Sequence, residues 1–119
     1  MGNFIGGTLD PIVIDGRTYS PTTLWSSTNV DASGTYTSDW VDLSKYDMKT
    51  AAINTTTSGT LTIQVTFTSS TATAYNYYTD NNVPSGLTTK SFTENVYYVR
   101  LQFVPSSSGT IDGWLIGRG

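Results

Sequence analysis

Hydroxyl and aromatic side chains supply most of the chemistry available to this chain of 119 residues. Roughly a third of the residues are Ser or Thr, and the chain contains 8 Tyr and 3 Trp. His and Cys, the usual general base and thiol nucleophile of enzymes, are absent from the sequence. This set of side chains favours a protein that works by binding through its surface, and we expect that it is not an enzyme.

The remaining charged side chains do not form a catalytic pattern. A glycosidase needs two carboxylates at a set separation, but Asp39 and Asp42 are three residues apart, and such residues point to opposite faces of a strand. A nucleophilic Ser would need a basic partner, and Lys45, Lys49 and Lys90 all lie in polar stretches that are typical of solvated side chains. We therefore expect no catalytic residues.

One oxygen-rich segment, Asp80-Asn81-Asn82, could contact a metal ion. Calcium takes six to eight oxygen ligands, and one carboxylate with two amides supplies too few. A solvated turn is the simpler interpretation, and we expect neither a metal site nor a cofactor.

Aromatic side chains give the strongest indication of a binding surface. Tyr75, Tyr77 and Tyr78 form a cluster in sequence, and Trp40 could add another flat surface on which a sugar ring stacks. In the alternative interpretation, two of these tyrosines pack at the edge of the core and the third contacts a protein partner. Arg100, on the polar face of a strand, is expected to pair with a carboxylate or with a neighbouring subunit.

The charge and hydropathy of the chain exclude several partners. A net charge of −3, with six scattered Lys and Arg, argues against nucleic acid, which attracts a basic face. No apolar run is long enough to span a bilayer, and residues 1–7 lack the pattern of a signal peptide. We expect a soluble protein without disulfides, since it contains no Cys.

Residues 1–10 predict a flexible N-terminal arm, because Gly2, Gly6 and Gly7 disfavour an ordered element. In the simpler interpretation these residues are a frayed terminus. Three apolar side chains would then be exposed, and we expect them instead to bind a neighbouring subunit or capsid: Phe4, Ile5 and Leu9. Residues 11–119 form the single domain, and residues 11–21 open it as a short hairpin that turns at Asp15-Gly16 and ends at Pro21.

Two segments, 61–67 and 97–103, alternate apolar and polar residues most regularly, as strands with one buried face do. Thr66 falls on the polar face and is expected to be solvated. The side chains predicted to face the core are Leu61, Ile63, Val65, Phe67, Val99, Leu101 and Phe103.

Strands and turns recur every 8 to 12 residues, a rhythm typical of sandwiches and barrels. No segment has a helical period, and residues 69–86 are the least regular stretch. The sequence predicts an all-β antiparallel sandwich of about eight strands, of jelly-roll type, with the flexible N-terminal arm. Further strands are expected at 24–30, 35–43, 48–56, 87–93 and 111–116.

Three segments together carry a resemblance: residues 38–46 around Trp40, residues 58–64 after Gly59, and residues 97–103 around Arg100. Their order resembles small jelly-roll virion proteins of tailed bacteriophages, of the capsid decoration (cement), head-fibre or tail-appendage type. The resemblance implies a structural protein that binds and stabilises the head surface. Its partners would be the major capsid protein or other virion proteins, its state a homo-oligomer, with a trimer favoured, and its location the virion, after synthesis in the bacterial host cytoplasm.

Two alternatives remain open. The pattern Trp40-x-Asp42-Leu43 followed by Tyr98-Val99-Arg100-Leu101 is also similar to galactose-binding-like domains. That resemblance implies a carbohydrate-binding module or a receptor-binding appendage tip, with Tyr75–Tyr78 as the glycan contact. The second alternative is a tail or neck component of the virion.

Overall fold

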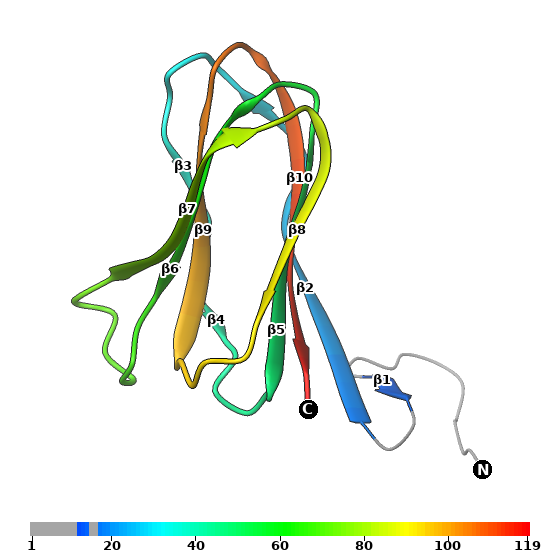
Figure 1. Ribbon diagram of the computed structural model, residues 1–119, viewed down its shortest axis with the longest axis vertical. Helices are drawn as coiled ribbons and strands as arrows, with labels where there is room; N and C mark the ends of the chain where they lie inside the picture. Colours follow the sequence, from blue (N-terminus) through cyan, green and yellow to red (C-terminus); the bar gives the residue numbers. More distant parts are fainter. Residues whose placement is uncertain (1–11, 15–16) are drawn as a thin grey trace.

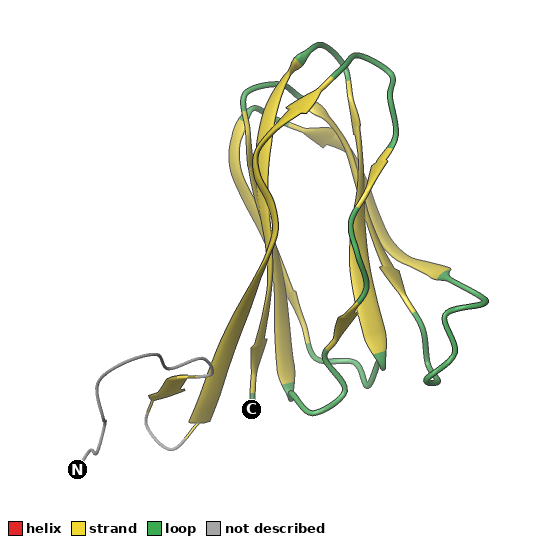
Figure 2. Cartoon of the chain, turned by 180° about the vertical axis from the view of Figure 1, so that it is seen from behind, coloured by secondary structure: helices red, strands yellow, loops and turns green. Residues whose placement is uncertain are grey.

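The computed structural model describes residues 12–14 and 17–119, with side chains from residue 19 onward. Two antiparallel sheets of five strands each face one another as the layers of a sandwich (Figure 1). Loops join the layers at both ends, as the view from behind shows (Figure 2). The described residues contain no helix, and the predicted all-β sandwich is confirmed.

The first sheet has, in spatial order, β1 (Ile12–Ile14), β2 (Arg17–Val30), β10 (Gly109–Arg118), β5 (Met48–Thr55) and β8 (Gly86–Phe92). The second has β3 (Tyr36–Thr37), β9 (Tyr98–Pro105), β6 (Gly59–Val65) and β7 (Tyr75–Val83), with β4 (Val41–Asp42) also paired to β9.

The order of the strands is that of a jelly roll. β2-β10-β5-β8 faces β3-β9-β6-β7, and most connections cross from one sheet to the other. The strand expected at 35–43 is instead two short ones, because Ser38 interrupts it: its amide donates to the Leu101 carbonyl, and its hydroxyl accepts from the Leu101 amide. This split, together with β1, gives ten strands where about eight were expected.

The core lies between the sheets and is built by alternation along the central strands. Six of the seven side chains predicted to face it are at most 1% exposed: Leu61, Ile63, Val65, Val99, Leu101 and Phe103. Gly59 lets the Phe103 ring approach the backbone of β6, since a Cβ there would lie 2.7 Å from Phe103 Cζ. The two most regular segments of the sequence therefore form the centre of the second sheet.

The predicted faces are wrong at two adjacent residues. Phe67 is 58% exposed and Thr66 is 1% exposed, the reverse of the expectation. β6 ends at Val65, and the Thr66 hydroxyl then accepts from the Tyr98 amide and donates to the Thr68 carbonyl. A side chain that bonds to backbone in this way competes with the regular ladder, so the alternation of the sequence continues where that of the strand does not.

The hairpin predicted at the start of the domain is present, but its end is not where it was expected. Ile14 pairs with Arg17 across residues 15 and 16, which lie outside the described part. Pro21 does not end a strand, since β2 continues to Val30. At Pro21 the strand pairs with Ile116 of β10, while β1 pairs only as far as Tyr19.

Lys49 was expected to be solvated and is buried, with 1% of its surface exposed. It lies on β5 in line with Ala51 and Ile53, which also face the core. Its Nζ donates to the Glu94 carbonyl at 2.8 Å. Burial lowers the pKa of this ammonium group, because removal from water disfavours the charged form.

Candidate functional site

The outer face of the second sheet carries the most ordered set of polar side chains. Along β6 and β9, residues that alternate with the core point outward and lie opposite one another: Thr60 with Val104, Thr62 with Gln102, and Gln64 with Arg100. Because cross-strand partners share a face, these pairs form one continuous surface. β7 extends this surface with Thr79 and Asn76, which pair with Thr62 and Gln64.

Three outward side chains form a hydrogen-bonded line across β9, β6 and β7, here called the guanidinium–amide row: Arg100, Gln64 and Asn76. Arg100 Nε donates to Gln64 Oε1 at 2.8 Å, and Gln64 Nε2 donates to Asn76 Oδ1 at 2.9 Å. Each group is planar and is held by its neighbour. The row is therefore a preorganised set of polar groups on an otherwise regular sheet.

Aromatic rings adjoin one end of the row. The guanidinium of Arg100 lies over the Trp40 ring, 4.3 Å from its centroid, a cation–π arrangement. The Trp40 ring is also 6.4 Å from that of Tyr98, at an angle of 54°. Asp42, opposite Tyr98, accepts from the amide and hydroxyl of Ser44, and these bonds lower the pKa of its carboxyl, so that it stays ionised.

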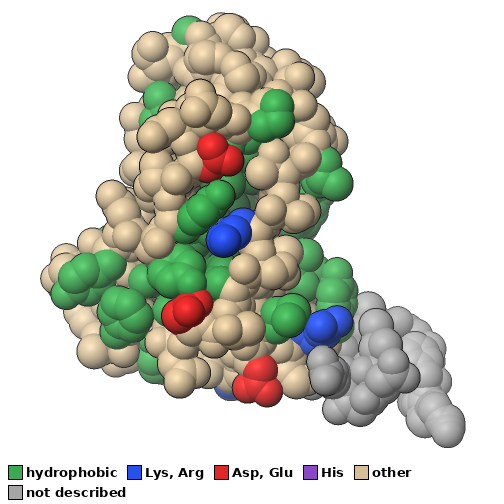
Figure 3. All heavy atoms as spheres, in the orientation of Figure 1, with side chains coloured by type: hydrophobic (Ala, Val, Ile, Leu, Met, Phe, Trp, Pro, Cys, Tyr) green, Lys and Arg blue, Asp and Glu red, His purple; other side chains and the backbone are tan. Residues whose placement is uncertain are grey.

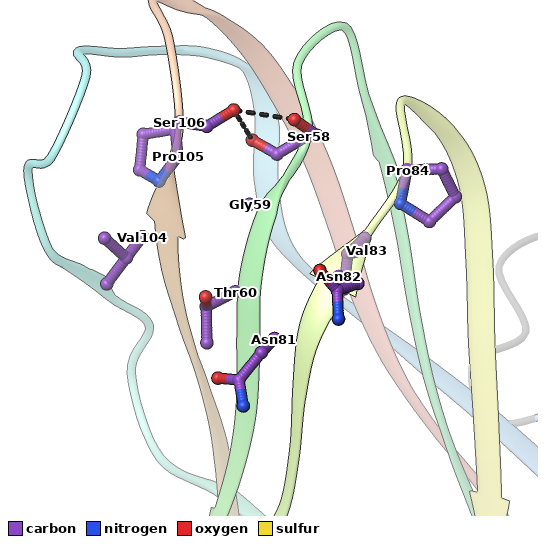
Figure 4. Close-up of a pocket in the computed structure, with 10 residues that line it drawn as sticks. All are labelled: Ser58, Gly59, Thr60, Asn81, Asn82, Val83, Pro84, Val104, Pro105 and Ser106. Atoms are coloured by element: carbon purple, nitrogen blue, oxygen red, sulfur yellow. Dashed lines mark hydrogen bonds between the residues drawn. The ribbon is translucent and has the colours of Figure 1, made fainter.

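The other end of the same sheet has an open pocket of about 430 Å³ (Figure 4). Its walls come from β6, β7 and β9 and include Thr60, Asn81 and Val104. At its top, the Ser58 and Ser106 hydroxyls are 2.6 Å apart, and Ser106 Oγ also donates to the Ser58 carbonyl. These two hydroxyls bond to each other and so hold two turns together. They are therefore less available to a ligand than the polar groups of the row.

The open side between the two layers, along β7 and β8, holds a second cluster, here called the seam: Tyr77, Tyr78, Lys90, Phe92 and Glu94. In Figure 3, hydrophobic side chains gather along this line between the layers, with acidic and basic side chains among them. The Tyr77 ring packs 4.9 Å from Phe92, and Lys90 Nζ lies 4.6 Å from the centre of the Tyr78 ring. The seam thus joins two strands that share no ladder.

A hydrogen bond within the seam joins β7 to the loop before β9. The Tyr77 hydroxyl donates to Glu94 Oε1. The bond raises the pKa of Tyr77 to about 12, with burial as a smaller cause, because the carboxylate acceptor stabilises the neutral phenol. The same bond lowers the pKa of Glu94, because a donated hydrogen bond stabilises the ionised carboxylate. The bond therefore joins β7 to the loop that precedes β9.

A third feature is an exposed aromatic pair formed by Phe67, in the β6–β7 loop, and Tyr75, the first residue of β7. Phe67 and Tyr75 are 58% and 52% exposed, and their ring centroids are 5.6 Å apart. Together with Thr66, Thr68, Ser70 and Thr73 they line a small pocket of about 210 Å³. Exposed aromatic rings of this kind are typical of protein contact surfaces.

The structure does not bring the four predicted glycan contacts onto one surface. Tyr78 pairs with Ile63 and so faces the inner side of the sheet, whereas Trp40 lies over Arg100 on the outer side. A register shift between Ile63 and Gln64 turns Tyr77 toward the seam, and Tyr75 packs on Phe67 instead. The other predicted contacts, Phe4, Ile5 and Leu9 of the arm, lie outside the described residues.

The sequence analysis singled out Arg100 but missed its two partners in the row, Gln64 and Asn76. Gln64 and Arg100 both fall on the polar face of a regular strand, so pairing those two strands would have aligned them. Lys49 continues the alternation of Ala51 and Ile53 toward the core. Arg100 was expected to pair with a carboxylate or with a neighbouring subunit; its partners within this chain are an amide and an indole ring.

The remaining predictions on ligands concern metals and membranes. The segment Asp80-Asn81-Asn82 belongs to β7 and is not a turn; Asp80 Oδ1 accepts from the Asn82 amide. Within the described residues, no three His, Cys, Asp or Glu side chains gather as metal ligands would. No helix in that same part of the chain is long and apolar enough to cross a membrane.

Comparison with known proteins gives a likeness of fold. No protein-family model and no curated protein matches the chain. The SPBc2 prophage-derived protein YomS is 9% identical, with a TM-score of 0.55 over 89% of this chain and 99% of that one. A protein of the Bacillus endospore appendages, described as a family of disulfide-linked pili, is 14% identical, with a TM-score of 0.51 over 99% of this chain and 95% of that one.

These identities are low, so the likeness is one of fold. The expected resemblance to phage proteins holds at that level, because the sandwich is shared with a prophage-derived protein. It is shared equally with an appendage protein that forms disulfide-linked pili, although the present chain has no cysteine. This chain is thus a jelly-roll β-sandwich similar in fold to a prophage protein and to a spore-appendage protein.

Proposed function

We propose that this chain is a structural protein of a bacteriophage virion, and specifically a capsid decoration (cement) protein that binds the head. The observation that carries the proposal is the likeness in fold to a prophage-derived protein over nearly the whole of both chains. The likeness to a protein of pili gives further support, since that protein works by assembling with other chains. Side chains suited to binding, without a catalytic set, fit the same role.

Exposed apolar side chains offer the surface for such binding. Phe67, Tyr75 and Leu87 are 58%, 52% and 68% exposed. Docking would remove their apolar surface from water, which stabilises a complex by roughly 25 cal/mol per Å² before the costs of association. A protein that binds only the assembled shell stabilises that shell by mass action.

Open sheet edges support the proposed homo-oligomer. β8 pairs with β5 along one side, and no described strand pairs with its other side. An unpaired edge can add a strand from another chain. A trimer whose subunits meet at such edges, with the residue 1–10 arm docked through Phe4, Ile5 and Leu9, is the assembly that we propose. A tail or neck component would use the same features.

Heads assembled without this protein test the proposal. Purified protein is mixed with such heads, occupancy is measured by cryo-electron microscopy, and head stability is measured by heating. We expect saturable, symmetric occupancy and a higher melting temperature of the head. The double variant Phe67→Ser/Tyr75→Ser should reduce occupancy, whereas Thr23→Ser, on the other sheet, should not.

Two results would contradict the proposal. Detection of the protein in tails or necks alone, by labelling intact virions, would support the second structural candidate. Absence of the protein from purified virions would overturn a structural role altogether. Deletion of residues 2–9 tests the arm separately: occupancy should fall while the melting temperature of the isolated domain stays nearly unchanged.

A further inference from the structure

We propose that the outer face of the second sheet binds an acidic glycan, with a sugar carboxylate held by the guanidinium–amide row. The row includes neither residue of the exposed aromatic pair nor any residue of β8, so the proposal stands apart from the decoration role. It begins from the direction of the hydrogen bonds in the row. Arg100 has only donors, so Gln64 must present Oε1 to it and Nε2 to Asn76.

This direction leaves the row with unused donors. Asn76 accepts through Oδ1, so its Nδ2 group is left to donate, and the terminal nitrogens of Arg100 and the second hydrogen of Gln64 Nε2 are donors as well. The row therefore presents N–H groups to a ligand on three adjacent strands. The matching ligand carries acceptor oxygens at a similar spacing.

Charge selects an acidic ligand. The partners of Arg100 are an amide and an indole ring, neither of which carries a negative charge. A carboxylate would supply it, because the planar guanidinium fork binds carboxylates through two parallel hydrogen bonds. The ionised carboxyl of Asp42 lies at the Trp40 end of the face, so repulsion places the ligand carboxylate toward Gln64 and Asn76.

The surroundings of the row favour a sugar over an acidic peptide. Trp40 and Tyr98 are partly buried aromatic rings beside the row. Arg100 covers one face of Trp40, and the Tyr97 ring lies 4.8 Å from that of Tyr98, so the exposed part of Trp40 is the surface on which the C–H face of a pyranose ring would pack. Hydroxyls and amides flank the row, as in the pairs Thr62–Thr79 and Gln102–Thr37, and these can exchange hydrogen bonds with sugar hydroxyls. A peptide site would more typically have a pocket for an apolar anchor, and the pockets described above share no lining residue with the row.

The test is a titration of the full chain with acidic oligosaccharides and their neutral counterparts, followed by NMR. The panel contains oligomers of galacturonate, glucuronate, mannuronate and sialic acid, each with its methyl ester, and polyglutamate as the acidic peptide. We expect saturable binding of at least one acid, with its ester weaker by about tenfold or more. Added salt should weaken binding, since the contact is exposed.

Variants locate the site. Arg100→Lys keeps the charge but removes the fork, and it should weaken binding by about tenfold. Lys90→Gln removes a positive charge from the seam, on β8 of the first sheet, and should leave binding unchanged. If Arg100→Lys lowers the melting temperature strongly, the site is located from the NMR titration of the wild-type protein instead. In that titration the backbone amides of residues 64, 76 and 100 should shift most.

Four results would overturn the proposal. These are failure of every acidic sugar to bind, equal affinity for an acid and its ester, equal or tighter binding of polyglutamate, and binding whose largest spectral shifts fall away from the row. The decoration test is independent of all four, because its readout is occupancy on heads.

Discussion

β6 and β9 lie side by side, and their sequences alternate equally well, yet the two strands differ in how far the structure follows that alternation. In β9, buried residues alternate with partly exposed ones from Tyr98 to Pro105. In β6 the apolar residues Leu61, Ile63 and Val65 face the core, although Thr62 on the outer face is also buried; after Val65 the pattern reverses, with Thr66 buried and Phe67 exposed.

The two strands differ in what the chain does at the end of the strand. β9 has β6 on one side and the short β3 and β4 on the other. After Val65, the chain keeps two backbone bonds, Thr66 N to the Tyr98 carbonyl and Tyr97 N to the Thr66 carbonyl, and then turns away. The Thr66 hydroxyl bonds to the Tyr98 amide and the Thr68 carbonyl across this turn. Alternation in sequence thus predicts a face only as far as the strand extends, and β6 ends at Val65 although two backbone bonds continue at Thr66.

The largest effect is expected when one Phe in each region is replaced by Ala and the two losses of stability are compared. Phe103→Ala should lower the free energy of unfolding by about 3 to 5 kcal/mol, because it empties a fully buried site beside Gly59. Phe67→Ala should cost less than about 1 kcal/mol, because its ring is largely exposed. Urea unfolding of both variants measures the difference, and equal costs would mean that Phe67 is also part of the core.

A medium effect is expected where the pattern reverses. Thr66→Val keeps the shape but removes the hydroxyl that bonds to the Tyr98 amide and the Thr68 carbonyl, at a cost of about 1 to 3 kcal/mol. Thr62→Val is the matched control, since its hydroxyl has only a 3.3 Å contact with Thr79 on the outer face. If the two variants are equally stable, the Thr66 hydroxyl does not hold the turn.

A smaller effect is expected where β6 and β9 meet on the outer face. A double-mutant cycle with Gln64→Ala and Arg100→Ala should give a coupling energy of about 0.5 to 1 kcal/mol, because the hydrogen bond is only partly buried. Urea unfolding of the four proteins measures it. Additive effects would show that the row is not held together in solution.

Local patterns in the sequence were sufficient for the fold class and for most of the core. Thr66 and Phe67 could not be predicted in this way, because their exposure depends on where a partner strand ends. Lys49 was predictable in principle, since the alternation through Ala51 and Ile53 places it inward; its polar neighbours in sequence outweighed that signal.

The binding surface was harder to predict than the core. Trp40 and Tyr78 were grouped because both are aromatic, and the sheet separates them by placing one on each face. Gln64 and Asn76 carried no signal as single residues, because amides are common on polar faces. Their alignment with Arg100 follows from the register of three strands and from the shift beside Tyr77, which are properties of the whole sheet.

The smallest effect is expected at the seam, where β7, the other neighbour of β6, bonds to the loop that leads into β9. Because the bond to Tyr77 lowers the pKa of Glu94, it adds stability above the ordinary pKa of a carboxyl, and this contribution is lost as pH falls through the lowered value. Because it raises the pKa of Tyr77 from 10.0 to about 12, it adds stability below pH 10 that is lost as pH rises toward 12.

Tyr77→Phe should therefore flatten the dependence of melting temperature on pH at both the acid and the alkaline ends, whereas Tyr75→Phe, in the exposed pair, should leave it unchanged. Parallel profiles for wild type and Tyr77→Phe would show that the hydrogen bond between Tyr77 and Glu94 does not form in solution.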